Sequence, residues 1–136
     1  MKKVKFIVVL FLLTCITSLA NIKADSYLGF TGITIPSLQG IYTSTAVNKK
    51  TMSDQYISKT GAIDKLSGDE RAIGARIQGA TTSYVTVPKD SYAKLGSGST
   101  GLGLSPVAHK LEMRANKWTV SSISFSGIWI LDDYLL

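Results

Sequence analysis

A glycine-rich stretch at residues 95–106 carries the most recognisable chemical pattern in the sequence. Its Gly96, Gly98 and Gly101 match G-x-G-x-x-G, the spacing with which a backbone approaches a dinucleotide pyrophosphate. That site also needs a strand directly before the first glycine and a helix that opens at the last. Pro88 ends the preceding strand pattern, and the residues after Gly101 are a poor helix start. We therefore expect a flexible Gly/Ser-rich loop at 95–106 and no cofactor.

The same loop carries leucines with no evident role in a core. Apolar side chains on a mobile loop are candidates for contact with a partner or a membrane. Tyr92, shortly before the loop, and Tyr134, in the apolar C-terminal tail, are further candidates of this kind. The weak candidates for binding are therefore Leu95, Leu102, Leu104, Tyr92 and Tyr134.

His109 is the single histidine and the one side chain of its type available for acid–base catalysis. It falls on the same face of a predicted strand as Leu111 and Met113, and no nucleophile-elbow motif accompanies it. Zinc needs three or four ligands, which one histidine does not supply. We expect a structural histidine and no metal.

Carboxylates are the remaining candidates for chemistry. Asp64, Asp69 and Glu70 lie close together in the sequence, but the D-x-D-x-D-G pattern of a calcium loop is absent. A pair of acids for glycoside hydrolysis would be unusual in so small a domain. The sequence favours a solvated turn with a local ion pair to Arg71, so we assign no catalytic residue and expect no enzyme.

The N-terminus has the pattern of a secretory signal peptide. Lysines at three of the first five positions precede an uncharged run of 15 residues, Phe6 to Ala20. A membrane-spanning helix needs about 20 apolar residues, so this run suits a signal peptide better. We expect residues 1–24 to be cleaved after Ala24, with Ala20 as the alternative site, and residues 25–136 to form a secreted β domain.

Two other readings of this segment stay open. One is an uncleaved N-terminal anchor. The other is a lipoprotein, because Leu12-Leu13-Thr14-Cys15 resembles a lipobox, although Thr14 stands where such a motif has a small residue. We favour secretion over lipid attachment at Cys15.

The charge and cysteine content change once residues 1–24 are set aside. The formal charge of the chain is +6, but residues 25–136 hold 11 lysines and arginines against nine acidic residues, which leaves +2. That value gives no strong electrostatic case for nucleic acid or for an anionic membrane. The chain has one cysteine, Cys15, so the domain holds no disulfide and depends on a single hydrophobic core. An exported, cysteine-free domain is typical of Gram-positive bacteria.

Alternating apolar and polar residues predict the clearest strands. Residues 71–79 place Ile73, Ala75 and Ile77 on one face. Residues 83–87 place Val85 and Val87 inward before Pro88. A third strand, at 107–114, is followed by a turn at 115–117, and we expect the returning strand to begin at Trp118.

The last strand changes face. Trp118 and Val120 stand at even positions, whereas Phe125 and Trp129 stand at odd ones. Side chains of period two do not change face without an extra residue, so we predict a bulge or bend at 121–122. We assign Trp118, Phe125 and Trp129 to the core, and expect Gly127 to leave room for a neighbouring ring.

The earlier part of the chain has weaker patterns. We predict a strand at 32–35, a strand pair at 38–47 and 55–63 joined across 48–53, and a turn at 67–70. Short helical turns at 64–66 or 90–95 are alternatives. About six to eight strands with frequent turns predict an all-β, single-domain antiparallel β-sandwich or barrel.

Three functional hypotheses follow from an exported β domain without a catalytic or metal constellation. The first is non-enzymatic binding of a protein, a glycan or a cell surface. The second is a bacteriocin-like or membrane-active toxin that touches the membrane through the 95–106 loop and the tail, without a spanning helix. The third is a small hydrolase or hydrolase inhibitor.

Overall fold

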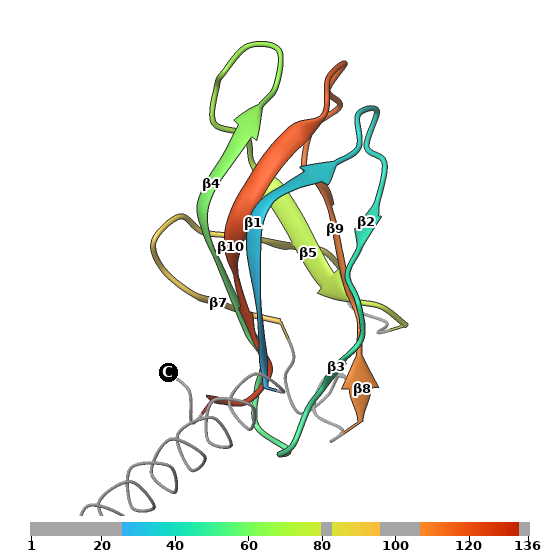
Figure 1. The fold of residues 1–136 in the computed structure, drawn as a ribbon, viewed down its shortest axis with the longest axis vertical. Coiled ribbons are helices and arrows are strands. Elements are labelled where there is room, and N and C mark those ends of the chain that lie inside the picture. Colours follow the sequence, from blue (N-terminus) through green and yellow to red (C-terminus); the bar gives the residue numbers. More distant parts are fainter. Residues whose placement is uncertain (1–25, 80–82, 96–106, 134–136) are drawn as a thin grey trace, which may run out of the picture.

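The chain folds into sheets of antiparallel strands (Figure 1). The computed structural model describes residues 26–79, 83–95 and 107–133. These residues contain strands and turns and no helix. The expected signal peptide with its cleavage sites and Cys15, the glycines of the 95–106 loop, and Leu102, Leu104 and Tyr134 lie outside the described residues.

The first sheet has four strands in the order β1-β10-β4-β7. Their bounds are β1 Tyr27–Ile35, β10 Ile123–Ile130, β4 Tyr56–Asp64 and β7 Ala93–Lys94. The two long neighbours of β10 pair with it along almost its whole length. β10 is therefore the centre of this sheet.

The second sheet also has four strands, in the order β2-β9-β5-β6. They span β2 Tyr42–Thr43, β9 Leu111–Ala115, β5 Ile73–Ile77 and β6 Val85–Thr86. β5 and β9 pair over five residues and form its centre.

A third, two-stranded sheet pairs β3 with β8 at the end of the molecule where the described chain begins and ends (Figure 1). β3 spans Val47–Asn48 and β8 spans Ala108–His109. His109 lies opposite Val47 and is buried, as expected for a structural residue.

Both large sheets contribute to one hydrophobic core. Ile73, Ala75 and Ile77 of β5 are buried together, which confirms the predicted face. Phe125 and Trp129 of β10 are also fully buried, and the Trp129 Nε1–H donates to Gln55 Oε1 at 2.8 Å. Burial of such large apolar side chains supplies most of the stability of a domain without disulfides.

The chain reverses close to the predicted turn at 67–70, but the turn itself lies at residues 65–67. Gly68 adopts a φ of 76°, which glycine reaches without strain, and its amide donates to the Asp64 carbonyl at 2.8 Å. This bond spans four residues and closes a single, isolated helical turn at 65–67, which overlaps the alternative expected at 64–66. The other alternative, at 90–95, is wrong, because Ala93–Lys94 forms β7.

The predicted strand pairings near both ends of the chain are wrong. Residues 38–47 and 55–63 do not pair, because β2 and β3 join β9 and β8 whereas β4 joins β10. β9 and β10 are not a hairpin either, since each is central in a different sheet. Local alternation marks a strand but does not choose its partner.

The sheets do not close into a barrel over the described residues, which rules out that alternative. The described residues form ten strands, more than the predicted six to eight, because several strands are only two residues long. Short strands of this kind leave no periodic signal in a sequence.

Of the three aromatic residues assigned to the core, Trp118 is the one for which the prediction is wrong. Its side chain is 66% exposed, and Val120 is exposed as well. β10 begins at Ile123, after both of them, so the change of face falls in a connection between the sheets. The backbone bends there at Val120 and Ser121, so the predicted bend is present and the alternative of a bulge is wrong. The register irregularity of β10 lies instead between Ser126 and Gly127.

Candidate functional site

One end of the molecule is built from three connections, at residues 36–41, 65–72 and 116–122; we call it the loop end (Figure 1). It lies opposite the end at which the described chain starts and stops, because β10 runs from the loop end towards it. Backbone hydrogen bonds join the three connections. The Leu38 amide donates to the Thr119 carbonyl at 2.8 Å, and the Lys65 amide donates to the Ser122 carbonyl at 3.0 Å.

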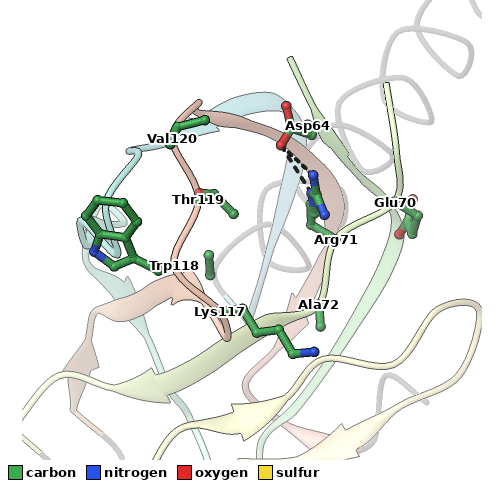
Figure 2. Close-up of a pocket in the computed structure, with 9 residues that line it drawn as sticks. Asp64, Glu70, Arg71, Ala72, Lys117, Trp118, Thr119 and Val120 are labelled. Atoms are coloured by element: carbon green, nitrogen blue, oxygen red, sulfur yellow. Dashed lines mark hydrogen bonds and ion pairs between the residues drawn. The ribbon is translucent and has the colours of Figure 1, made fainter. Parts of the chain in front are cut away.

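A cavity of about 440 Å³ opens at the loop end (Figure 2). This size is within the usual range of small-molecule sites. One wall is the 117–120 segment, and the other carries the side chains of the 64–72 segment. The lining residues are Asp64, Glu70, Arg71, Ala72, Ala115, Lys117, Trp118, Thr119 and Val120.

The exposure of Trp118 follows from the path of the backbone. After β9 the chain leaves the second sheet and crosses to the first, so residues 116–122 belong to neither sheet. The Thr119 hydroxyl donates to the Ser121 carbonyl at 3.0 Å, which holds the crossing in place. A fixed backbone with an outward indole presents a flat, apolar face to a ligand without prior ordering.

Asp64 and Arg71 form the polar side of the cavity. Arg71 Nη2 and Nε each lie 3.1 Å from Asp64 Oδ2. Asp64 Oδ1 accepts hydrogen bonds from the Ser121 hydroxyl and from the amides of Leu66 and Ser67. The Ser121 hydroxyl foremost, then these amides, hold the pKa of the Asp64 carboxyl well below its usual range. Asp64 is therefore an ionised structural group and a poor proton donor.

Glu70, the other carboxylate of the lining, is engaged in the same way. Lys59 Nζ lies 3.1 Å from Glu70 Oε1, which also accepts from the Ala62 amide at 3.0 Å. Each carboxylate that lines the cavity therefore has a cationic partner. The lining offers an aromatic face, paired charges and the ammonium of Lys117, a set suited to binding.

Besides Trp118, exposed apolar side chains stand on the three connections of the loop end, and one of them, Val120, lines the cavity. Leu38, Leu66 and Val120 are exposed by 54%, 78% and 73%. Leu38 and Gln39 hold φ values of 59° and 57°, a left-handed conformation that non-glycine residues rarely adopt. Strained backbone that presents an exposed leucine is the kind of feature that concentrates at functional sites.

The binding candidates from the sequence do not meet at this site. Leu95 is buried in the core, and its amide donates to the Gln55 carbonyl at 2.8 Å, so its expected role as an exposed contact is wrong. Tyr92 is half exposed but precedes β7, which pairs with the far end of β4. Within the described ranges no three His, Cys, Asp or Glu residues are placed to hold a metal ion. No described helix has the length and apolarity to cross a membrane.

The sequence did contain a signal for Trp118. Trp118 and Val120 share a parity opposite to that of the β10 core residues, and this break indicates that they precede the strand. No family model, no curated protein and no solved structure matches this chain. The site is therefore defined by its own geometry.

Proposed function

We propose that this protein is a secreted, non-enzymatic β-sandwich that acts by binding a protein, a glycan or a cell surface through its loop end. The observation that supports this proposal is the cavity beside Trp118, an exposed indole on a backbone held by hydrogen bonds. Exposed tryptophan at a concave site is a frequent anchor of binding energy. Both lining carboxylates are held in ion pairs, an arrangement better suited to recognition than to acid–base catalysis.

The proposal includes export. Residues 1–24 act as a signal peptide and are removed after Ala24, which releases the β domain. The intact mass of the protein recovered from the culture medium tests this directly. A species that begins at Asp25, or at Asn21, supports export, whereas a membrane-held species that begins at a lipidated Cys15 contradicts it.

The binding site is tested by comparing Trp118→Ala with Met52→Ala. Met52 is 63% exposed and lies in the connection before β4, at the opposite end of the molecule. The two proteins are incubated with intact cells, isolated cell walls and immobilised glycans, and the bound fraction is measured. We expect Trp118→Ala to weaken binding at least tenfold and Met52→Ala to leave it unchanged. Equal binding by both variants would place the site elsewhere.

A further inference from the structure

We propose that the loop end docks on an anionic phospholipid bilayer, with its apolar side chains in the interface and the ammonium groups of Lys65 and Lys117 against the headgroups. This inference rests on the proposed function and names the surface that the same site binds. It is carried by three observations: the arrangement of the apolar side chains, the balance of charge around them, and the orientation of the loop end relative to the rest of the chain.

The apolar side chains are separate projections. Leu38, Leu66, Trp118 and Val120 come from three different connections, and each is more than half exposed. Leu66 lies in the turn after β4, where Ser67 and Gly68 complete the reversal of the chain. Isolated apolar tips on separate connections suit a deformable acyl interface, into which each tip inserts independently. Tryptophan at the same level is typical of the boundary between acyl chains and headgroups.

The charges around these tips favour an anionic surface. Asp64 and Glu70 are neutralised by Arg71 and Lys59, as described above. Lys65 and Lys117 carry positive charge on the same connections, against the carboxylate of Asp69. The Lys65 ammonium donates to the Thr34 hydroxyl at 2.6 Å, a neutral partner that leaves its charge uncompensated. Lysines beside inserted apolar groups attract anionic headgroups and extend their ammonium groups towards the aqueous side.

The orientation of the loop end fits docking by one end. The three connections project together at the end of the molecule opposite the start of β1 and the end of β10 (Figure 1). The first residues of β1 and the last residues of β10 therefore lie at the end away from the bilayer. Met52, an equally exposed apolar side chain on that far side, gives a matched control.

Tryptophan fluorescence tests this inference on the full chain. The chain has two tryptophans, the exposed Trp118 and the buried Trp129, and residues 1–24 contain none. The emission change is therefore specific to the loop end even if the N-terminal segment touches lipid. Emission is followed during titration with vesicles of phosphatidylcholine alone and of phosphatidylcholine with phosphatidylglycerol, and brominated acyl chains then measure the depth of the indole.

We expect a blue shift of Trp118 emission and quenching by brominated chains with the anionic vesicles. Leu66→Asp should weaken this binding by roughly tenfold or more, because it replaces an inserted apolar side chain with a carboxylate that the anionic headgroups repel. Met52→Asp should leave it within about twofold. Because Leu66 is so exposed, near-ultraviolet circular dichroism should show that both variants keep the native fold.

Three outcomes overturn the inference. They are no emission change with either vesicle, equal response to neutral and anionic vesicles, and equal loss in the Leu66 and Met52 variants. If the protein does not bind the vesicles, but Trp118→Ala still abolishes its binding to a glycan or a protein, the lipid inference fails and the proposed binding function stands. If Trp118→Ala changes no binding to any partner, the proposed function fails as well.

Discussion

Replacing Asp132 with asparagine should strongly destabilise the protein, and far more than the same change at its neighbour Asp133. The carboxylate ties the segment after β10 to the connection before β4. Lys49 Nζ lies 3.1 Å from Asp132 Oδ1, and both side chains are fully buried. The Lys49 ammonium also donates to the Leu131 carbonyl.

The remaining oxygen positions of Asp132 are filled by the same connection. The Thr51 amide and hydroxyl donate to Oδ1 at 2.8 and 2.6 Å, and the Lys50 amide donates to Oδ2 at 3.0 Å. An asparagine in this place keeps one acceptor, turns an NH₂ towards donors, and leaves the Lys49 ammonium buried without a counter-charge. Removing one member of a buried ion pair typically costs about 3–5 kcal/mol.

Urea unfolding of the wild type and of Asp132→Asn, followed by Trp129 emission in a Trp118→Phe background, measures this loss. Asp133→Asn is the matched control, because Asp133 is the exposed neighbour, and we expect a change within about 0.5 kcal/mol. Adding Lys49→Met to Asp132→Asn should recover part of the loss, since it removes the buried ammonium that the asparagine leaves without a counter-charge. A loss below about 1 kcal/mol in Asp132→Asn would refute the reasoning.

Three further predictions follow from the same structure. Burial by itself raises the pKa of Asp132, but hydrogen bonds from the Thr51 hydroxyl and the Lys50 and Thr51 amides outweigh it and lower the pKa to about 2. The stability that this carboxylate contributes is therefore fully present above its unfolded pKa of about 4 and is lost as the pH falls to about 2. Over this pH range the unfolding free energy of Asp132→Asn should fall less than that of the wild type. Gly127→Ala should cost about 1–3 kcal/mol in urea unfolding, because a Cβ there would lie 2.2 Å from the Ser58 carbonyl oxygen, whereas Gly29→Ala, with no atom within 4 Å, should change stability by less than about 1 kcal/mol. Iodide should quench the emission of Trp129→Phe strongly and that of Trp118→Phe weakly, and the reverse order would contradict the exposure of Trp118.

The sequence by itself determined the fold class and the best-defined core face. The alternation of Ile73, Ala75 and Ile77 predicts a strand with one buried side, and the structure places all three in the core. Gly127 was expected to admit a neighbouring ring. A Cβ there would lie 3.0 Å from Phe125 Cζ, but nearer still, at 2.2 Å, to the Ser58 backbone oxygen of β4, a cross-strand contact that the sequence did not reveal. The buried face could be predicted because it depends on the period-two geometry of a single strand.

Tertiary structure alone decided which strands pair and what the loops present. β9 and β10 follow one another in the sequence, but they become central strands of different sheets, and that choice leaves Trp118 on a crossing and in solvent. Leu95 is the opposite case, because it was predicted to be exposed and is buried. Its loop-like sequence context did not reveal that its amide would pair with Gln55 and that its side chain would reach the core. Pairing and burial of this kind depend on contacts between residues far apart in the chain, so no local pattern encodes them.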